Sequence, residues 1–247
     1  MSASDVCRLV EQFVAAKNHG ADPEQLNLLA ELIQQCNQRA YLGDTTFVSR
    51  RYKVTDSEMG KWKRLSAYVA PSSDTKLFDC AFGSGRDLLV GQQLGYDVYG
   101  CELSSDLYAD FVASCKFSKD KLFHADFRSI PCPDKTFDVV RHNASFLHLP
   151  VICKGYTVHK CLQETCRILK DDGLVYVYTK EGSGFVTIDT GDGLGVRSFQ
   201  LFDEQLLRQV LYECGFEVLQ INHFTRERNG APIQWIEAFA QKKADLC

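Results

Sequence analysis

The stretch KLFDCAFGSGRDLLVGQQLGYDVYGCEL, from Lys76 to Leu103, decides the fold of this 247-residue chain. It predicts a short apolar strand, a turn of small residues at 81–85, an amphipathic helix that ends at Gly95, and a second strand that ends at Glu102. Glycine in the turn lets the backbone approach a ligand closely and adopt angles that a Cβ forbids. This order of strand, glycine turn, helix, strand and acid is typical of α/β domains that bind a nucleoside.

The glycine pattern indicates which nucleoside the turn can bind. A dinucleotide-binding turn requires G-x-G-x-x-G, and the corresponding positions here hold Ala81, Gly83 and Arg86. The bulky arginine disfavours a dinucleotide, and the sequence has no phosphate-binding loop of the G-x-x-x-x-G-K-[ST] type. What remains is D-x-[GA]-x-G-x-G over residues 79–85, followed by Glu102. A plain tight turn without a ligand is the alternative interpretation.

This pattern resembles the cofactor motif of the class I S-adenosylmethionine-dependent methyltransferases. The resemblance implies that S-adenosyl-L-methionine binds at the turn, and a carboxylate at the second strand tip suits the two ribose hydroxyls. The candidate cofactor-binding residues here are Asp79, Ala81, Phe82, Gly83, Gly85, Glu102 and Leu103. The family usually has glycine where this chain has Ala81, and we expect alanine to be tolerated unless its φ is positive.

The resemblance extends over roughly residues 41–240 and implies further contacts with the cofactor. It places Asp126 at the adenine amino group and Phe127 against the adenine ring. Independently, a carboxylate just beyond a strand tip lies where open α/β sheets bind ligands. In the family, the end of the strand at 137–142 lines the site between cofactor and substrate, which adds Asn143 to the candidates.

A basic segment before the first strand is the candidate for the methionine end of the cofactor. The resemblance implies that Arg50, Arg51 or Tyr52 reaches the methionine carboxylate, and Arg51 is our choice among them. The alternative interpretation is that these residues are solvated surface charges.

Methyl transfer requires little chemistry from the protein. A sulfonium methyl is already electrophilic, so orientation and the exclusion of water can supply most of the acceleration, and we predict no metal site. If the acceptor carries a proton, His142 and His148 are the candidate catalytic bases, because an imidazole titrates near neutral pH. His124 is a weaker candidate, since the family places it on the adenine side. The alternative roles are a hydrogen-bonded scaffold for His142 and capping or packing for His148.

Strands and helices alternate from Lys76 to Ile221, which predicts a mainly parallel sheet with right-handed crossovers. Strands are expected near 77–78, 98–101, 121–124, 137–142, 174–180, 216–221 and 234–240. No helix pattern precedes the last strand, so it can form a hairpin with the strand before it. Together with the resemblance, this predicts an α/β fold: a Rossmann-like, doubly wound, mainly parallel seven-stranded sheet with an N-terminal helical extension.

We divide the chain into an N-terminal helical extension or lid at 1–72 and a catalytic domain at 73–247. The extension has helix patterns at 5–17 and 22–39 that carry no obvious chemical group, so packing or a dimer contact is their expected role. Residues 181–198 are rich in glycine and predict a mobile loop or flap over the site. A calcium loop is disfavoured, because Gln200 stands where a bidentate glutamate is needed.

Composition limits the partners of this protein. The formal net charge is −4, the pI is about 5.9, and no basic stripe is visible, which argues against nucleic acid as the principal partner. No apolar run is long enough to span a membrane, and no signal peptide is visible. The eleven cysteines include no C-x-x-C pair and predict buried thiols in a reducing cytoplasm. We expect a monomer or homodimer that acts on a small molecule.

Three functions compete at this point. A methyltransferase that acts on a small-molecule acceptor agrees best with the motif. A non-catalytic protein that binds S-adenosylmethionine has only Ala81 in its favour, and an NAD-dependent oxidoreductase is disfavoured by Arg86. The sequence does not identify the methyl acceptor.

Overall fold

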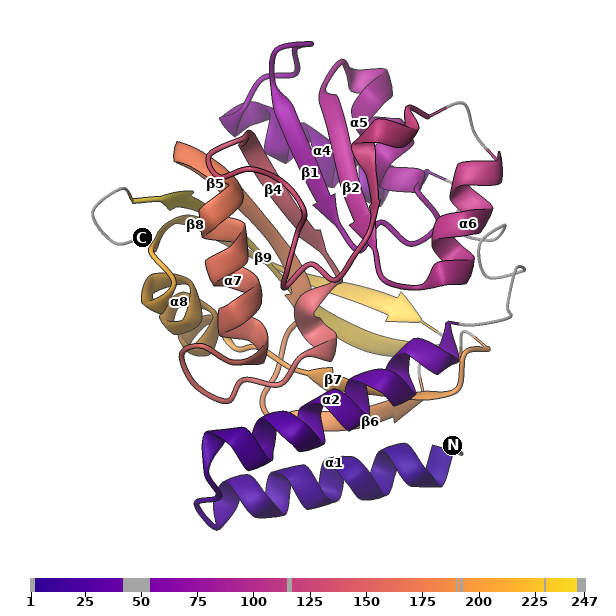
Figure 1. The fold of residues 1–247 in the computed structure, drawn as a ribbon, viewed down its shortest axis with the longest axis vertical. Coiled ribbons are helices and arrows are strands. Elements are labelled where there is room, and N and C mark those ends of the chain that lie inside the picture. Colours follow the sequence, from indigo (N-terminus) through magenta and orange to yellow (C-terminus); the bar gives the residue numbers. More distant parts are fainter. Residues whose placement is uncertain are drawn as a thin grey trace.

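A seven-stranded sheet with the strand order β3-β2-β1-β4-β5-β9-β8 forms the centre of the protein (Figure 1). The computed structural model describes residues 3–41, 54–114, 117–189, 191, 193–228 and 230–243. The strands are β1 (Lys76–Cys80), β2 (Asp97–Glu102), β3 (Leu122–His124), β4 (Phe137–Asn143), β5 (Leu169–Lys180), β8 (Phe216–Arg228) and β9 (Ala231–Lys242). The first five are parallel, and β9 lies antiparallel between β5 and β8. The predicted fold is confirmed.

Helices cover both faces of the sheet, and each face has its own apolar core. One face packs against α4 (Asp56–Tyr68), α5 (Arg86–Leu94) and α6 (Ser105–Ser114), and the other against α7 (Thr157–Ile168) and α8 (Glu204–Glu213). Leu77 belongs to the first core, and its neighbour Phe78 belongs to the second. This follows from the period of two in a strand, which turns successive side chains to opposite faces.

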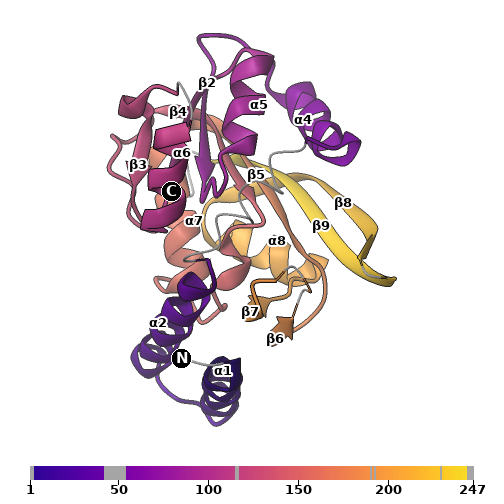
Figure 2. The same cartoon turned by 90° about the vertical axis from the view of Figure 1, so that its right-hand side faces the viewer.

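The N-terminal helices pack away from the sheet. Figure 2 shows α1 (Ala3–Asn18) and α2 (Pro23–Ala40) at one end of the molecule, beside a two-stranded antiparallel hairpin of β6 (Phe185–Asp189) and β7 (Val196–Gln200). An apolar cluster joins them, in which the rings of Phe13 and Phe185 lie 5.3 Å apart, edge to face. The predicted loop at 181–198 is therefore wrong in part: it contains β6 and the start of β7.

Two element boundaries also differ from the prediction. The sequence after Pro150 predicts a helix from about Val151 to Leu169, whereas the helix begins only at Thr157. The sequence DDG at 171–173 predicts a turn, but these residues lie inside β5, where the pairing with β4 shifts register and Asp172 has a φ of +61°. A bulge of this kind accommodates turn residues without ending the strand.

The proposed extension at 1–72 does not pack as one unit. Helices α1 and α2 pack on the hairpin, whereas Trp62 and Leu65 of α4 are buried in the core of the sheet. Residues 42–53 lie outside the described residues. The domain boundary at 72 and the role of the extension as a lid stay predictions.

Candidate functional site

A cavity of about 610 Å³ opens at the carboxyl ends of the central parallel strands, which point toward α2 (Figure 1). Strand β1 lies between β2 and β4, so the strand order reverses at this point, where open α/β sheets bind ligands. The turn after β1 and Glu102 line one part of the cavity. Residues of α2, β5, β7, β8 and β9 line the opposite part.

The turn after β1 depends on left-handed backbone at residues 81, 83 and 85, whose φ angles are +57°, +56° and +74°. Gly85 ends the turn and precedes α5. A Cβ at Gly85 would lie 2.0 Å from the ring of Phe111, so glycine is required there for the packing of α6. Gly85 does not line the cavity, in contrast to Gly83.

Ala81 is the strained position of this turn, because its φ of +57° disfavours any residue with a Cβ. The condition for tolerance stated above is therefore not met, and we expect the alanine to cost stability. Ala81→Gly should relieve about 1–2 kcal/mol of strain and lose about 0.4–1 kcal/mol through the more flexible unfolded chain. Its thermal midpoint should rise by about 1–4 °C.

The matched control for that substitution is Ala15→Gly in the exposed part of α1, which should be destabilising by up to about 1 kcal/mol. Thermal unfolding followed by circular dichroism measures both variants. A lower midpoint for Ala81→Gly than for the unchanged protein would contradict the strain argument.

Glu102 holds the turn in place and still faces the cavity. Its Oε2 accepts a hydrogen bond from the backbone N–H of Gly83 at 2.9 Å, and its Oε1 accepts one from Ser104 at 2.8 Å. Burial raises the pKa of the Glu102 carboxyl, and these two backbone hydrogen bonds partly offset that effect. Because each carboxylate oxygen can accept a second hydrogen bond, both oxygens keep acceptor capacity for a vicinal diol.

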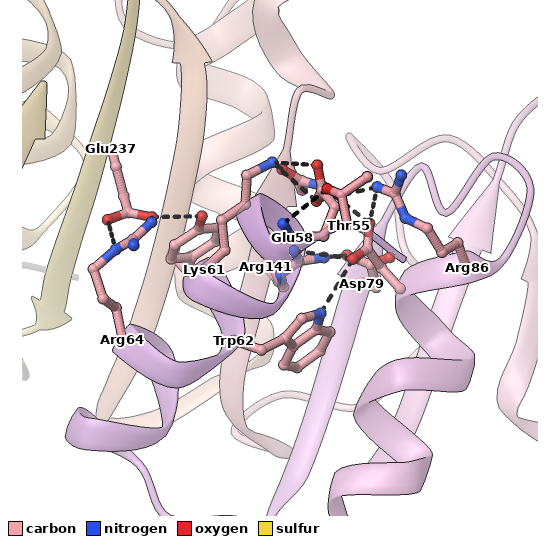
Figure 3. A network of polar contacts seen from close by, with 12 residues as sticks. Thr55, Glu58, Lys61, Trp62, Arg64, Asp79, Arg86, Arg141 and Glu237 are labelled. Atoms are coloured by element: carbon pink, nitrogen blue, oxygen red, sulfur yellow. Dashed lines mark hydrogen bonds and ion pairs between the residues drawn. The ribbon is translucent and has the colours of Figure 1, made fainter. Parts of the chain in front are cut away.

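Below the turn lies a buried charge cluster, which we define as Glu58, Lys61, Asp79, Arg86, Asp87 and Arg141 (Figure 3). Arg141 is 1% exposed, and its guanidinium lies 3.3 Å from Asp79 and 3.2 Å from Asp87. The indole N–H of Trp62 donates to Asp87 at 3.2 Å. One arginine therefore links the end of β1 to the start of α5.

Burial has opposite outcomes for the two aspartates of the cluster. Burial raises the pKa of Asp79, and Arg141 offsets only part of this effect. Burial also acts to raise the pKa of Asp87, but Arg141, Arg86 and Lys61 together lower it below its usual range. Asp87 is therefore the more acidic of the two carboxyls.

Lys61 of α4 connects this cluster to the end of β4. Its ammonium donates to Glu58 at 3.1 Å and to the Oδ1 of Asn143 at 3.0 Å. The amide of Asn143 donates in turn to Asp87 at 2.9 Å. Burial lowers the pKa of Lys61 to about 8, and Glu58 partly opposes this shift.

The structure brings most of the sequence-predicted candidates to one cavity. Those that line it are Asp79, Ala81, Phe82, Gly83, Glu102, Leu103, Phe127, Asn143 and His148. Gly85, Asp126 and His142 do not line it, and Arg50, Arg51 and Tyr52 lie outside the described residues. For all of these candidates, a contact with a ligand stays a prediction.

Asp126 is engaged in an ion pair instead of facing the cavity. Arg128 donates to the Asp126 carboxylate at 2.7 Å and also pairs with Glu31 of α2. This contact ties the loop after β3 to the N-terminal helices. A role for Asp126 at the adenine amino group therefore requires this ion pair to rearrange.

His142 lies behind the cavity wall. Its Nδ1 contacts the hydroxyl of Ser145 at 3.1 Å, and its Nε2 contacts the hydroxyl of Thr165 at 2.9 Å. The side chain is 1% exposed, and burial lowers its pKa to about 3. This environment fits the scaffold role and disfavours the role of catalytic base, which leaves His148 as the histidine that faces the cavity.

The sequence analysis missed most of the part of the cavity opposite the turn. That part is lined by Gln34, Asn37, Gln38, Tyr41, Tyr178, Lys180, Arg197, Phe199, Arg226 and Trp235. Aromatic contacts are prominent there: Tyr178 and Trp235 stack at 4.8 Å, and Lys180 lies 4.9 Å from the Trp235 ring. Walls with stacked aromatic rings suit a planar or partly apolar compound better than a highly charged, polymeric ligand.

Comparisons with known proteins agree with this geometry. Residues 78–177 match the model of a family described as a methyltransferase domain. No curated protein sequence matches the chain. Among solved structures, the chain is similar to an S-adenosylmethionine-dependent methyltransferase of Methanosarcina mazei. The two have 19% sequence identity and a TM-score of 0.61, and the match covers 72% of this chain and 96% of that one.

Two further structural neighbours differ in activity. One is a 1,6-didemethyltoxoflavin-N1-methyltransferase of Burkholderia thailandensis, whose structure contains 1,6-didemethyltoxoflavin and S-adenosylhomocysteine. It has 15% sequence identity to this chain and a TM-score of 0.58, and the match covers 98% of this chain and 91% of that one. The [4+2]-cyclase SpnF has 18% identity and a TM-score of 0.57, with coverage of 76% and 82%. These likenesses establish the fold.

Within the described ranges, no helix is both long and apolar enough to cross a membrane. The same part of the chain contains no group of three or more His, Cys, Asp or Glu side chains that could hold a metal ion.

Proposed function

We propose that this chain is a class I S-adenosylmethionine-dependent methyltransferase that methylates a small-molecule acceptor. The match of residues 78–177 to a methyltransferase-domain family and the similarity in fold to solved methyltransferases support the proposal. The observation that carries this proposal is the single cavity shared by the glycine turn, Glu102 and His148. Cofactor and acceptor can therefore meet without solvent between them. Such an arrangement supports in-line displacement, in which orientation and the exclusion of water provide most of the acceleration.

The residues present fit the cofactor. Glu102 keeps acceptor capacity on both oxygens for the ribose hydroxyls. Apart from the chain neighbours of Gly83, none of the described residues has an atom within 4 Å of the position that a Cβ would take there, which leaves room for a ligand above the turn. Phe127 lines the same cavity and offers an apolar surface to the adenine. When bound, the cofactor supplies an electrophilic sulfonium methyl group.

A small acceptor is favoured by the enclosure of the cavity. Helix α2 and strand β7 contribute Asn37 and Arg197 to the wall opposite the turn, so a polymer would have to displace them. The toxoflavin-precursor methyltransferase named above, which matches nearly the whole chain, acts on a small compound. Cytoplasmic location and a monomeric or homodimeric state remain part of this proposal, and nucleic acid and membranes are not expected as partners.

Calorimetry tests the cofactor assignment directly. S-Adenosylmethionine and S-adenosylhomocysteine should each bind with one-to-one stoichiometry, whereas NAD should not bind, because Arg86 occupies the third glycine position of the dinucleotide motif. A panel of small hydroxyl, amine and thiol compounds is then screened for methyl transfer by mass spectrometry. Binding of NAD in preference to S-adenosylmethionine would contradict the proposal, and binding without transfer to any compound would favour a non-catalytic role.

A further inference from the structure

Two aromatic rings and a guanidinium from three neighbouring strands meet in the part of the cavity opposite the glycine turn. They belong to Tyr178 of β5, Arg226 of β8 and Trp235 of β9, and all three side chains line the cavity. The rings of Tyr178 and Trp235 stack with an angle of 9° between their planes. The guanidinium carbon of Arg226 lies 5.3 Å from the centre of the Tyr178 ring.

Arg226 differs from the cations beside it in its lack of a carboxylate partner. Arg64 pairs with Glu237 at 2.6 Å, and Lys61 pairs with Glu58 at 3.1 Å. In the described part of the chain, Arg226 forms no ion pair, although its side chain is only partly exposed. A guanidinium is always charged at neutral pH and offers two parallel N–H donors to a carboxylate. The charge of Arg226 is therefore available to an anionic group in the cavity.

The hydroxyl of Tyr178 is a second donor at this place. The residue is 2% exposed, and its buried hydroxyl has no hydrogen-bond partner among the described residues. Burial raises the pKa of Tyr178, and Arg226 only partly offsets this effect, so the phenol keeps its proton at neutral pH. A buried polar group without a partner is destabilising, and an acceptor atom of a ligand would satisfy it.

We propose that the methyl acceptor is a small aromatic acid, whose carboxylate binds to the guanidinium of Arg226 and the hydroxyl of Tyr178. This inference rests on the proposed function and names the class of its substrate. Both donors are of the kind that a carboxylate accepts from, and the partly exposed ring of Trp235 gives the aromatic part of the acceptor a surface to pack on. Arg226 is thus a residue that determines specificity.

The distribution of charge around the cavity agrees with an acidic acceptor. Among the described residues, the carboxylates that line the cavity are Glu58, Asp79, Asp87 and Glu102, on the side of the glycine turn and the buried charge cluster. The wall opposite the turn contains Lys180, Arg197 and Arg226 and no acidic residue of the described chain. The acidic side therefore suits the sulfonium cation of the cofactor, and the basic side suits an anion.

The position of Tyr178 brings such an acid close to the end of β4. Tyr178 pairs in register with Asn143, the last residue of that strand, and both line the cavity. In the family, this strand end lines the site between cofactor and substrate. A carboxylate held at Tyr178 and Arg226 therefore anchors one end of the acceptor, while another atom of the same molecule takes the methyl group.

Calorimetry with matched probes tests this subsite in the protein saturated with S-adenosylhomocysteine. The probes are indole-3-acetate beside indole-3-acetamide, benzoate beside benzamide, and phenyl phosphate. At least one carboxylate should bind about tenfold more tightly than its amide, because the amide cannot form the charge-assisted hydrogen bonds. Arg226→Met should abolish this preference, and Tyr178→Phe, which keeps the stacked ring, should reduce it by about threefold or more. Arg208→Met, which removes an exposed arginine of α8, should leave it unchanged.

Circular dichroism shows that each variant is folded, and the affinity for S-adenosylhomocysteine is measured for each. That affinity should be unchanged in Arg226→Met; a loss of tenfold or more would assign the methionine carboxylate of the cofactor to Arg226 and overturn the proposal. Equal binding of each carboxylate and its amide, or a preference that survives Arg226→Met, overturns it too. If Arg226→Met does not fold, the response of Tyr178→Phe decides in its place.

Two outcomes separate this inference from its alternatives. Tighter binding of phenyl phosphate than of either carboxylate would show that the subsite takes a phosphate ester, which contradicts the assignment to an acid. Failure of the unaltered protein to bind S-adenosylhomocysteine contradicts the proposed function, and the paired probes without S-adenosylhomocysteine then still decide whether Arg226 and Tyr178 bind a carboxylate.

Discussion

Replacing Arg141 with methionine should lower the free energy of unfolding by about 3–5 kcal/mol. The guanidinium is 1% exposed and lies between Asp79 and Asp87, so its removal leaves two buried carboxylates without their shared cation. Methionine approximates the length of the arginine stem, so the change tests the charge more than the volume. In a chain of this size the thermal midpoint should fall by about 6–20 °C.

Two further variants separate the charge effect from a general loss of packing. Arg208→Met removes an exposed partner of Glu204 on α8 and should cost only about 0.3–0.5 kcal/mol. Adding Asp79→Asn to the Arg141→Met variant should recover part of the lost stability, because one of the stranded carboxylates is then neutral. Thermal and urea unfolding measure all three. A cost below about 1 kcal/mol for Arg141→Met would show that the buried charge cluster does not hold β1 and α5 together.

Glu102→Ala should weaken S-adenosylmethionine binding by about a hundredfold or more. Two hydrogen bonds from the ribose hydroxyls to a charged acceptor contribute about 1.5–3 kcal/mol each, and both are lost. The backbone N–H groups of Gly83 and Ser104 also lose their acceptor, so the turn loses its anchor at the same time.

Calorimetry measures the affinity of the Glu102→Ala variant for S-adenosylmethionine, and two further variants serve as controls. Glu102→Gln keeps one oxygen acceptor and should fall between the alanine variant and the unchanged protein. Glu217→Ala removes an exposed carboxylate of β8 that pairs with Lys243, and should leave the affinity unchanged. If Glu102→Ala is folded by circular dichroism and binds the cofactor as tightly as before, the assignment of the ribose site is wrong.

The central strands could be predicted because their side chains are apolar on both faces. Leu77 and Phe78 are each fully buried, and their strand is bounded by a turn with two glycines. The part of the cavity formed by the glycine turn and Glu102 followed from the same residues, since the acid at the end of β2 must lie beside the turn after β1 when the two strands are parallel.

The other part of the cavity could not be predicted, because its residues come from distant elements. Tyr41 follows an amphipathic helix that carries no chemical signal, and only the docking of α2 brings its hydroxyl to His148. Arg141 follows the apolar residues Val139 and Val140, and a charged side chain at that position suggests the end of a buried strand. Its two carboxylate partners belong to β1 and α5, and sequence periodicity does not reveal such pairing.

The glycine-rich segment shows how local composition can mislead. The glycines at 191, 193 and 195 lie in the connection of the hairpin, whereas the strands on either side contain Phe185 and Phe199, which are buried. A hairpin of two five-residue strands is marginal alone, and here it is stabilised by its contact with α1 and α2. That contact was invisible in the local sequence.

The packing of α1 and α2 on the hairpin has a consequence for synthesis on the ribosome. Cys7 contacts Thr187, a residue 180 positions later, so the N-terminal helices leave the ribosome long before their partner strands. During that interval the apolar side chains of Phe13 and Ile33, both buried in the finished protein, can be covered only by the other helix. The apolar surface of these two helices therefore stays partly exposed until β6 and β7 have been made. The glycine turn and Glu102 can assemble first, and the wall around Tyr41 closes only when β7 has been made.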